Sequence, residues 1–172
     1  MGMEKTVRKY LNFKNFVIFI CLDLVAIMVF YNIFEPKPIS THNEGLPRKQ
    51  AEIKVKNTGK IVKLTVELAQ SPKELELGLS RRAMMETGFG MYFVLPMRNI
   101  STFWMKDMRF PIDIIWIDEG KIVGIAKNSS IPKDQNNIPT FRSPQEVTNV
   151  LEVEAGFADK NNIKVGDTLI LQ

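Results

Sequence analysis

Asp113 is the side chain of this sequence that most needs a chemical explanation. It lies in the apolar segment 112–118, IDIIWID, where strand alternation places it on the same face as two isoleucines. A carboxylate among isoleucines is costly unless it is paired, and Arg82, Lys106 and Arg109 are possible partners. A structural salt bridge, or a carboxylate that accepts backbone N–H bonds, is the favoured explanation. The alternative is an acid perturbed by its surroundings in a functional site.

Methionine is concentrated in one part of the chain. Six of the nine methionines fall between residues 84 and 108, and Met105 and Met108 follow Trp104 closely. Soft thioethers beside an indole could bind Cu(I) outside the cytoplasm. Methionine is also ordinary core filler, and a site without cysteine or histidine would be weak. We therefore expect no metal or other cofactor, and keep Met105 and Met108 as weak copper candidates.

Aromatic side chains accompany these residues and could line a pocket for a sugar or a peptide. Phe103, Trp104, Phe110 and Trp116 lie within a short stretch of sequence. In a small domain such side chains more often fill the core, which is the favoured interpretation. The residues that we expect to form either a pocket or an internal brace are Arg82, Trp104, Lys106 and Asp113.

The cysteine and histidine content excludes several classes of site. Cys21 lies inside an apolar run and His42 lies in a proline-rich stretch, and the sequence has no other residue of either type. The remaining chain therefore has no disulfide, no thiolate nucleophile and no cysteine-ligated zinc. It also lacks the histidine that a Ser-His-Asp triad or a zinc-peptidase motif requires.

Residues 16–34, FVIFICLDLVAIMVFYNIF, have the length and composition of a transmembrane helix. Such a helix needs about 20 apolar residues. Basic residues precede the run, which predicts a cytoplasmic N-terminus and a C-terminal part outside the cytoplasm. The run ends in bulky residues rather than in a small-residue cleavage site, which favours an uncleaved anchor in the cell membrane over a signal peptide. Asp23 is an acid within this run that we interpret as tolerated by the apolar helix.

The net charge of +4 does not describe a basic domain. Residues 1–15 contain four of the basic residues and one acid, so residues 16–172 carry 19 basic and 18 acidic side chains. A nucleic-acid surface would need lysines and arginines clustered on one face, and we expect no nucleic-acid partner. The expected partners are the lipid bilayer, through residues 16–34, and an envelope protein or a small ligand.

The chain divides into a basic stub (1–15), the transmembrane helix (16–34), a polar proline-rich linker (35–50) and a globular domain (51–172). Alternating apolar residues predict mainly antiparallel strands in this domain. A capping box at Ser71 opens one short helix that ends near Arg81, and residues 155–162 form another. The fold class is α+β and predominantly antiparallel β, a compact β-rich or barrel-like domain with two short helices. The expected strands are a hairpin within 52–69, then 91–95, 101–105, 112–118, 121–126, 147–153 and 168–171.

Four blocks of the sequence resemble the family designated domain of unknown function 192: GLSRRAM (78–84), GMYFVLP (90–96), FWMKDMRFPIDIIWIDEGKIVGI (103–125) and VLEVEAGFADKNNIKVGD (150–167). The resemblance covers about residues 52–172. Asp107 stands where the family's pattern has asparagine, and Glu154 where it has proline. The resemblance implies a small β-rich domain, often secreted or membrane-tethered, and implies no activity. It raises the interest of Arg82, Trp104 and Asp113, whose types recur in the pattern.

The expected function is therefore non-enzymatic. We expect a membrane-anchored extracytoplasmic module that binds a small ligand or assists an envelope protein. The first alternative is an enzyme that acts on envelope material through Asp113, which would need a second carboxylate facing the same cleft. The second alternative is Cu(I) handling through Met105 and Met108, whose sulfurs would have to converge.

Overall fold

A computed structural model of the chain describes residues 45–134 and 136–172. Residues 46–172 form one compact unit. The predicted stub and transmembrane helix, residues 1–34, lie outside the described residues. Within the described part, no helix has both the length and the hydropathy to cross a bilayer.

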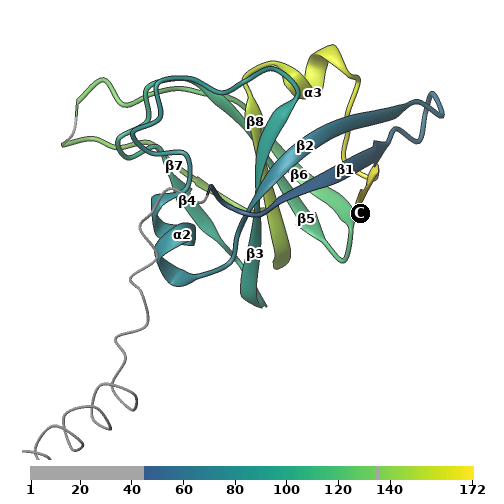
Figure 1. Cartoon of the computed structure of the whole chain (residues 1–172), viewed down its shortest axis with the longest axis horizontal. Helices are drawn as coiled ribbons and strands as arrows, with labels where there is room; N and C mark the ends of the chain where they lie inside the picture. Colours follow the sequence, from purple (N-terminus) through teal and green to yellow (C-terminus); the bar gives the residue numbers. More distant parts are fainter. Residues whose placement is uncertain (1–44, 135) are drawn as a thin grey trace, which may run out of the picture. The chain divides into compact units, whose positions relative to one another are not determined.

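Seven strands close into a barrel in the order β1-β2-β3-β8-β5-β6-β9 (Figure 1). Every neighbouring pair is antiparallel except β2 and β3, which run parallel. The β-rich, barrel-like prediction is confirmed. The barrel strands are β1 (Arg48–Lys54), β2 (Ile61–Ala69), β3 (Phe89–Asn99), β5 (Ile112–Asp118), β6 (Lys121–Ser129), β8 (Val147–Glu154) and β9 (Thr168–Leu171).

Helix α2 (Pro72–Leu77) belongs to the crossover that the parallel β2–β3 pair requires. Its capping box is present as predicted: the Ser71 hydroxyl accepts from the Glu74 amide, and the Glu74 carboxylate accepts from the Ser71 amide. The helix ends earlier than the sequence predicted. Gly78 caps it with a φ of +48°, and Arg81 has a φ of +67°, so the chain leaves the helical conformation before Arg81.

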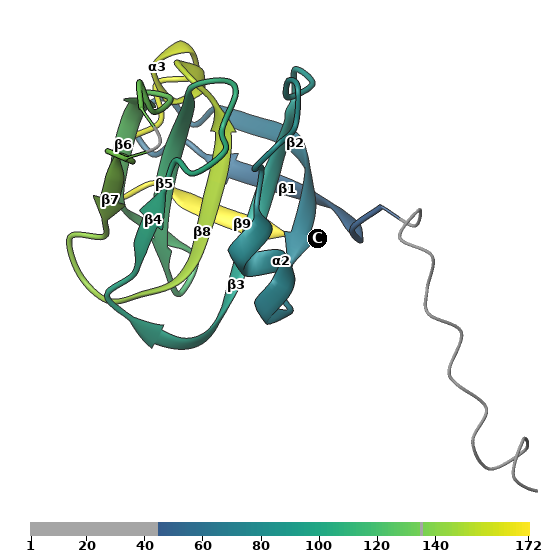
Figure 2. The same cartoon turned by 90° about the vertical axis from the view of Figure 1, so that its left-hand side faces the viewer.

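Two short strands form a separate sheet outside the barrel. They are β4 (Thr102–Trp104) and β7 (Thr140–Arg142), which pair antiparallel. β7 lies in a proline-containing loop where the sequence predicted no strand. In Figure 2 this small sheet and α2 lie in front of the barrel wall that contains β3, β5 and β8. The second predicted helix is also present, as α3 (Phe157–Lys160), which begins after Gly156 at a φ of +83°.

The domain has two hydrophobic cores. The inner core fills the barrel and takes side chains from all seven barrel strands, including Ile115 and Ile117. The outer core lies against β3, β5 and β8 and takes Ile114 and Trp116 from β5, together with side chains from α2, β4 and β7. The predicted alternation along β5 is thus confirmed, but both of its faces are buried. The outer core is the layer that holds the pocket described below.

The start of the domain differs from the expected linker boundary. β1 begins at Arg48 and pairs with β2 from its first residue, so the last residues of the predicted linker are already strand. Leu46 packs against the outer core. The strand begins with the exposed polar residues Arg48, Lys49 and Gln50, because β9 pairs only with the later part of β1. Exposed polar residues of this kind are difficult to distinguish from a linker by composition.

Candidate functional site

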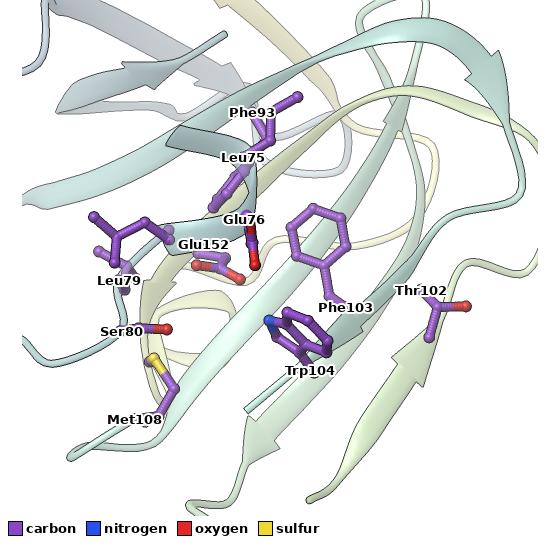
Figure 3. A pocket seen from close by; sticks show the side chains of 12 residues that line it. Leu75, Glu76, Leu79, Ser80, Phe93, Thr102, Phe103, Trp104, Met108 and Glu152 are labelled. Carbon is purple, nitrogen blue, oxygen red and sulfur yellow. The ribbon is translucent and has the colours of Figure 1, made fainter. Parts of the chain in front are cut away.

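A pocket with a volume of about 190 Å³ opens between α2 and β4. Apolar and aromatic side chains form most of its wall, and a few polar groups converge on it (Figure 3). Its small size suits a small molecule or part of a larger one. The apolar lining includes Leu75, Leu77, Leu79, Phe93, Phe103, Trp104 and Met108, and the polar side chains are Glu76, Ser80, Thr102 and Glu152.

Glu152 is the most unusual member of this lining. It lies on β8 on the outward face of the barrel, opposite Met91 and Ile114 of the neighbouring strands, and it is only 5% exposed. Within the described residues its carboxyl has neither a hydrogen-bond donor nor an ion-pair partner. Burial raises the pKa of Glu152 to about 8. A buried carboxyl without a partner is costly, and such groups are concentrated at functional sites.

Gly78 provides the space above this carboxyl. A Cβ atom at Gly78 would lie 3.2 Å from Cζ of Phe93 and 4.0 Å from Oε2 of Glu152. The backbone φ of +48° disfavours any other residue as well. The glycine at the C-terminus of α2 therefore both ends the helix and keeps the pocket open.

The aromatic residues have different roles. Phe103 packs edge-to-face against Phe93, with 4.9 Å between ring centroids, and against Trp116, with 5.5 Å. These three rings belong to the outer core, as the sequence predicted for aromatic residues in general. Trp104 differs, because it is 46% exposed and stands at the rim of the pocket. The Nζ atom of Lys106 lies 5.4 Å from its ring centroid, which is cation–π geometry.

A second pocket, of about 160 Å³, adjoins the first and shares Glu76, Leu77, Ser80 and Trp104 with it. Its other side chains are charged: Lys73, Arg81, Lys106 and Asp107. Arg81 is paired with Asp107 at 3.4 Å, whereas no described acid pairs with Lys73 or Lys106. The two pockets therefore form one groove, in which Glu152 lines only the first part, Lys73 and Lys106 line only the second, and Glu76 lines both.

Asp113 is an internal brace. It is fully buried, and its Oδ1 accepts from the amides of Asn128 at 2.8 Å and Gly156 at 3.1 Å, while Oδ2 accepts from Ala158 at 2.9 Å. These bonds tie β5 to the end of β6 and to the first turn of α3. None of the proposed cationic partners pairs with it. Of the three explanations open from the sequence, a salt bridge, a carboxylate that accepts backbone N–H bonds and a perturbed acid in a site, the geometry matches the second.

The other candidate residues are dispersed. Arg82 pairs with Glu67 at 2.6 Å in a separate small pocket, and Arg48 pairs with the same carboxylate at 3.1 Å. Trp104 and Lys106 line the groove, whereas Arg82 and Asp113 do not. Met108 lines the main pocket, but Met105 is fully buried in the outer core. The two sulfurs therefore do not share one open site.

Sequence reasoning missed Glu152 and Glu76. In VLEVE (150–154) alternation puts Glu152 and Glu154 on one face, which is typical of a strand with one side in water. The signal that could have raised Glu152 is its place inside one of the blocks resembling the family. Its burial depends on α2 and β4, which are distant in the sequence.

Comparison with known proteins agrees with this fold. The conserved pattern of the family DUF192, described as "Uncharacterized ACR", matches residues 53–171. The chain belongs to this family. This DUF192 domain is similar to a candidate transcription regulator from Sinorhizobium meliloti 1021, with 28% identity, a TM-score of 0.69, and coverage of 74% of this chain and 95% of the other. It is also similar to a protein of unknown function from Novosphingobium aromaticivorans DSM 12444, with 26% identity, a TM-score of 0.67, and coverage of 77% and 89%. No curated protein gives a significant match.

We expect Asp113→Asn to destabilise the protein by about 2–4 kcal/mol, because one amide oxygen cannot replace two charged acceptors for three backbone N–H groups. The free energy of unfolding from urea titrations measures the effect. The matched control is Asp159→Asn, which removes only a surface pair with Lys127 and should change stability by less than about 1 kcal/mol. Equal small losses in both variants would contradict the brace.

Glu152 should make the stability of the protein depend on pH. The folded state holds this proton up to about pH 8, whereas the unfolded chain releases it near its usual value of 4.5. The folded state thus binds more protons in this window, and stability should fall with rising pH by up to about 1.4 kcal/mol per pH unit. Glu152→Gln should remove this component, as urea titrations between pH 5 and pH 8 would show. Glu154→Gln, two residues along β8, should keep it, and an unchanged slope in Glu152→Gln would refute the assignment.

Proposed function

We propose that this protein is a membrane-tethered, extracytoplasmic binding module whose ligand is a small molecule held in the groove between α2 and β4. The observation that carries the proposal is the pocket over Glu152. A carboxyl that is buried and lacks a partner among the described residues costs stability, and a ligand that hydrogen-bonds to it would recover that cost.

The composition of the pocket supports ligand binding in particular. Small-molecule sites combine a mainly apolar lining with a few convergent polar groups. Here Phe103 and Trp104 provide the aromatic surface, while Glu76 and Glu152 provide the polar groups. Trp104 is exposed at the rim, as is Leu77, whereas Leu79, Phe93 and Met108 of the same lining are buried. An exposed indole beside a pocket is a ready contact for a ligand.

The tether is supported by the sequence of residues 16–34 and by the basic residues before it. The described domain begins only a short distance along the chain from the predicted anchor, so the module would act close to the membrane surface. We do not propose for this chain the regulator role in the description of the Sinorhizobium protein. A DNA-binding surface needs clustered basic residues, and over residues 16–172 basic residues exceed acidic ones by only one.

An enzyme that acts through a carboxyl is the second candidate function, with Glu152 in place of Asp113 as the acid. A carboxyl with a pKa of about 8 is suited to hold a proton near neutral pH, and Glu76 lines the same pocket. A pair of carboxyls in different surroundings is a common acid–base arrangement. The two candidates differ in the state of the ligand after binding: a binding module returns it unchanged, whereas an enzyme converts it.

The topology can be tested with C-terminal fusions of the full chain. We expect a fusion to alkaline phosphatase to be active and a fusion to green fluorescent protein to be dark, because the C-terminus would lie outside the cytoplasm. Removal of residues 1–34 should release the protein from the membrane fraction. A fluorescent, phosphatase-inactive pair of fusions would overturn the proposed orientation.

Ligand binding can be tested by ligand-observed NMR with a library of small organic fragments and the full chain in maltoside detergent. We expect a set of mutually competing fragments that lose binding in Trp104→Ala, because the indole forms one wall of the groove. Ile61→Ala is the matched control, since Ile61 has a similar exposed fraction (48%) and does not line this groove. Fragments that bind equally to both variants, or not at all, would refute the site.

A further inference from the structure

The ionisable groups that line the main pocket are all acids. They are the carboxyls of Glu76 and Glu152, and among residues 45–134 and 136–172 no lysine, arginine or histidine lines this pocket. Ser80 uses its hydroxyl hydrogen to donate to the carbonyl of Lys106 at 2.8 Å, so its oxygen remains as an acceptor. Once Glu152 is ionised, the polar side chains offer mainly acceptor oxygens, with the Thr102 hydroxyl as a further donor, and this suits a ligand that donates hydrogen bonds or carries positive charge.

We propose that the pocket binds a small organic cation, with its ammonium group beside Glu152 and against the rings of Phe103 and Trp104. This inference rests on the proposed function and names the chemical class of its ligand. The arrangement of Figure 3, in which the Glu152 carboxyl lies among Leu79, Phe103 and Trp104, provides both elements of ammonium recognition. Aromatic faces attract cations through their quadrupole, and a buried carboxylate supplies the compensating charge.

An alkylated ammonium fits this lining better than an inorganic cation does. Metal cations of the hard type need several oxygen ligands, whereas most of the wall here is carbon. The methyl groups of an alkylated ammonium can pack against Leu75, Leu79 and the aromatic rings while the charge remains close to Glu152. The indole of Trp104 already attracts one cation, the ammonium of Lys106, on its side of the groove.

The adjoining pocket extends the inference to a zwitterion. Lys73 and Lys106 line it without an ion-pair partner among the described residues, while Arg81 is paired with Asp107. Glu76 is the other acid of this lining, so the cationic side chains exceed the acidic ones by one. A ligand whose ammonium end occupies the main pocket could therefore place an anionic group near these two lysines. We expect a molecule that carries both charges to bind more tightly than one that carries the ammonium alone.

Cation binding should be linked to proton release. Glu76 of α2 is the other charged group that lines the pocket, and β3, β4 and the loop after α2 contribute only uncharged side chains to it. Because burial keeps Glu152 largely protonated at neutral pH, a cation must displace that proton to form an ion pair. Affinity should consequently rise between pH 6 and pH 8. A ligand that accepts a hydrogen bond from the protonated acid would show the opposite trend.

The test uses isothermal titration calorimetry of the full chain in a maltoside detergent, which contains neither ammonium nor phosphate. The probes are choline, phosphocholine, inorganic phosphate and 3,3-dimethylbutan-1-ol, the uncharged counterpart of choline. We expect choline to bind about tenfold or more tightly than its neutral counterpart, phosphocholine to bind a few-fold more tightly than choline, and phosphate to bind weakly. Titrations in buffers of different ionisation enthalpy should report proton release at pH 7.

Variants assign the effect to the proposed contacts. Glu152→Gln should lower the affinity for choline about tenfold and abolish proton release, whereas Glu154→Gln on the same strand should leave both unchanged. Urea titration of each variant establishes that it is folded. If choline and its neutral counterpart bind equally and Trp104→Ala abolishes both, the cation inference fails while the binding site stands. If fragments bind at the groove but neither charged probe does, the inference fails as well.

Discussion

The structure depends on one constraint, which is that strands β3 and β5 carry apolar side chains on both faces, and the neighbouring β8 adds Val150 on its outer face. One face fills the barrel and the other would meet water if nothing covered it. Helix α2 and the small β4–β7 sheet provide that cover, and their side chains complete the outer core. The cover is incomplete between α2 and β4, and this gap is the pocket. The candidate site is therefore a consequence of how a second layer closes over a barrel wall.

The carboxyls of Asp113 and Glu152 show that burial alone does not identify a functional site. Asp113 is enclosed and accepts hydrogen bonds from three backbone N–H groups, so it stabilises the fold at the start of β5. Glu152 is nearly as buried but has no described partner, and its pKa is raised by desolvation. The first carboxyl contributes its hydrogen-bonding capacity to the domain. The second has that capacity free, and the proposed ligand would use it.

Much of the fold could be predicted from the sequence because local signals were strong. Alternation predicted the antiparallel barrel strands, the Ser71 capping box predicted α2, and the apolar run at 112–118 predicted β5 with its two faces. The misses lie where local signals were weak. β7 is three residues long in a proline-containing loop, and the start of β1 is polar because part of that strand is exposed. Membrane tethering, on residues 16–34, rests on sequence alone.

The sequence by itself determined that the domain is β-rich, that cysteine and histidine chemistry is excluded from it, and that Asp113 must be paired or bonded. These conclusions follow from composition and from periodicity along single strands. Only the tertiary structure decided which acid faces a pocket. Alternation could place Glu152 on the outward face of β8, but whether that face meets water depends on α2 and β4, which approach it from distant parts of the chain. Desolvation is a property of the assembled layers, and no local pattern encodes it.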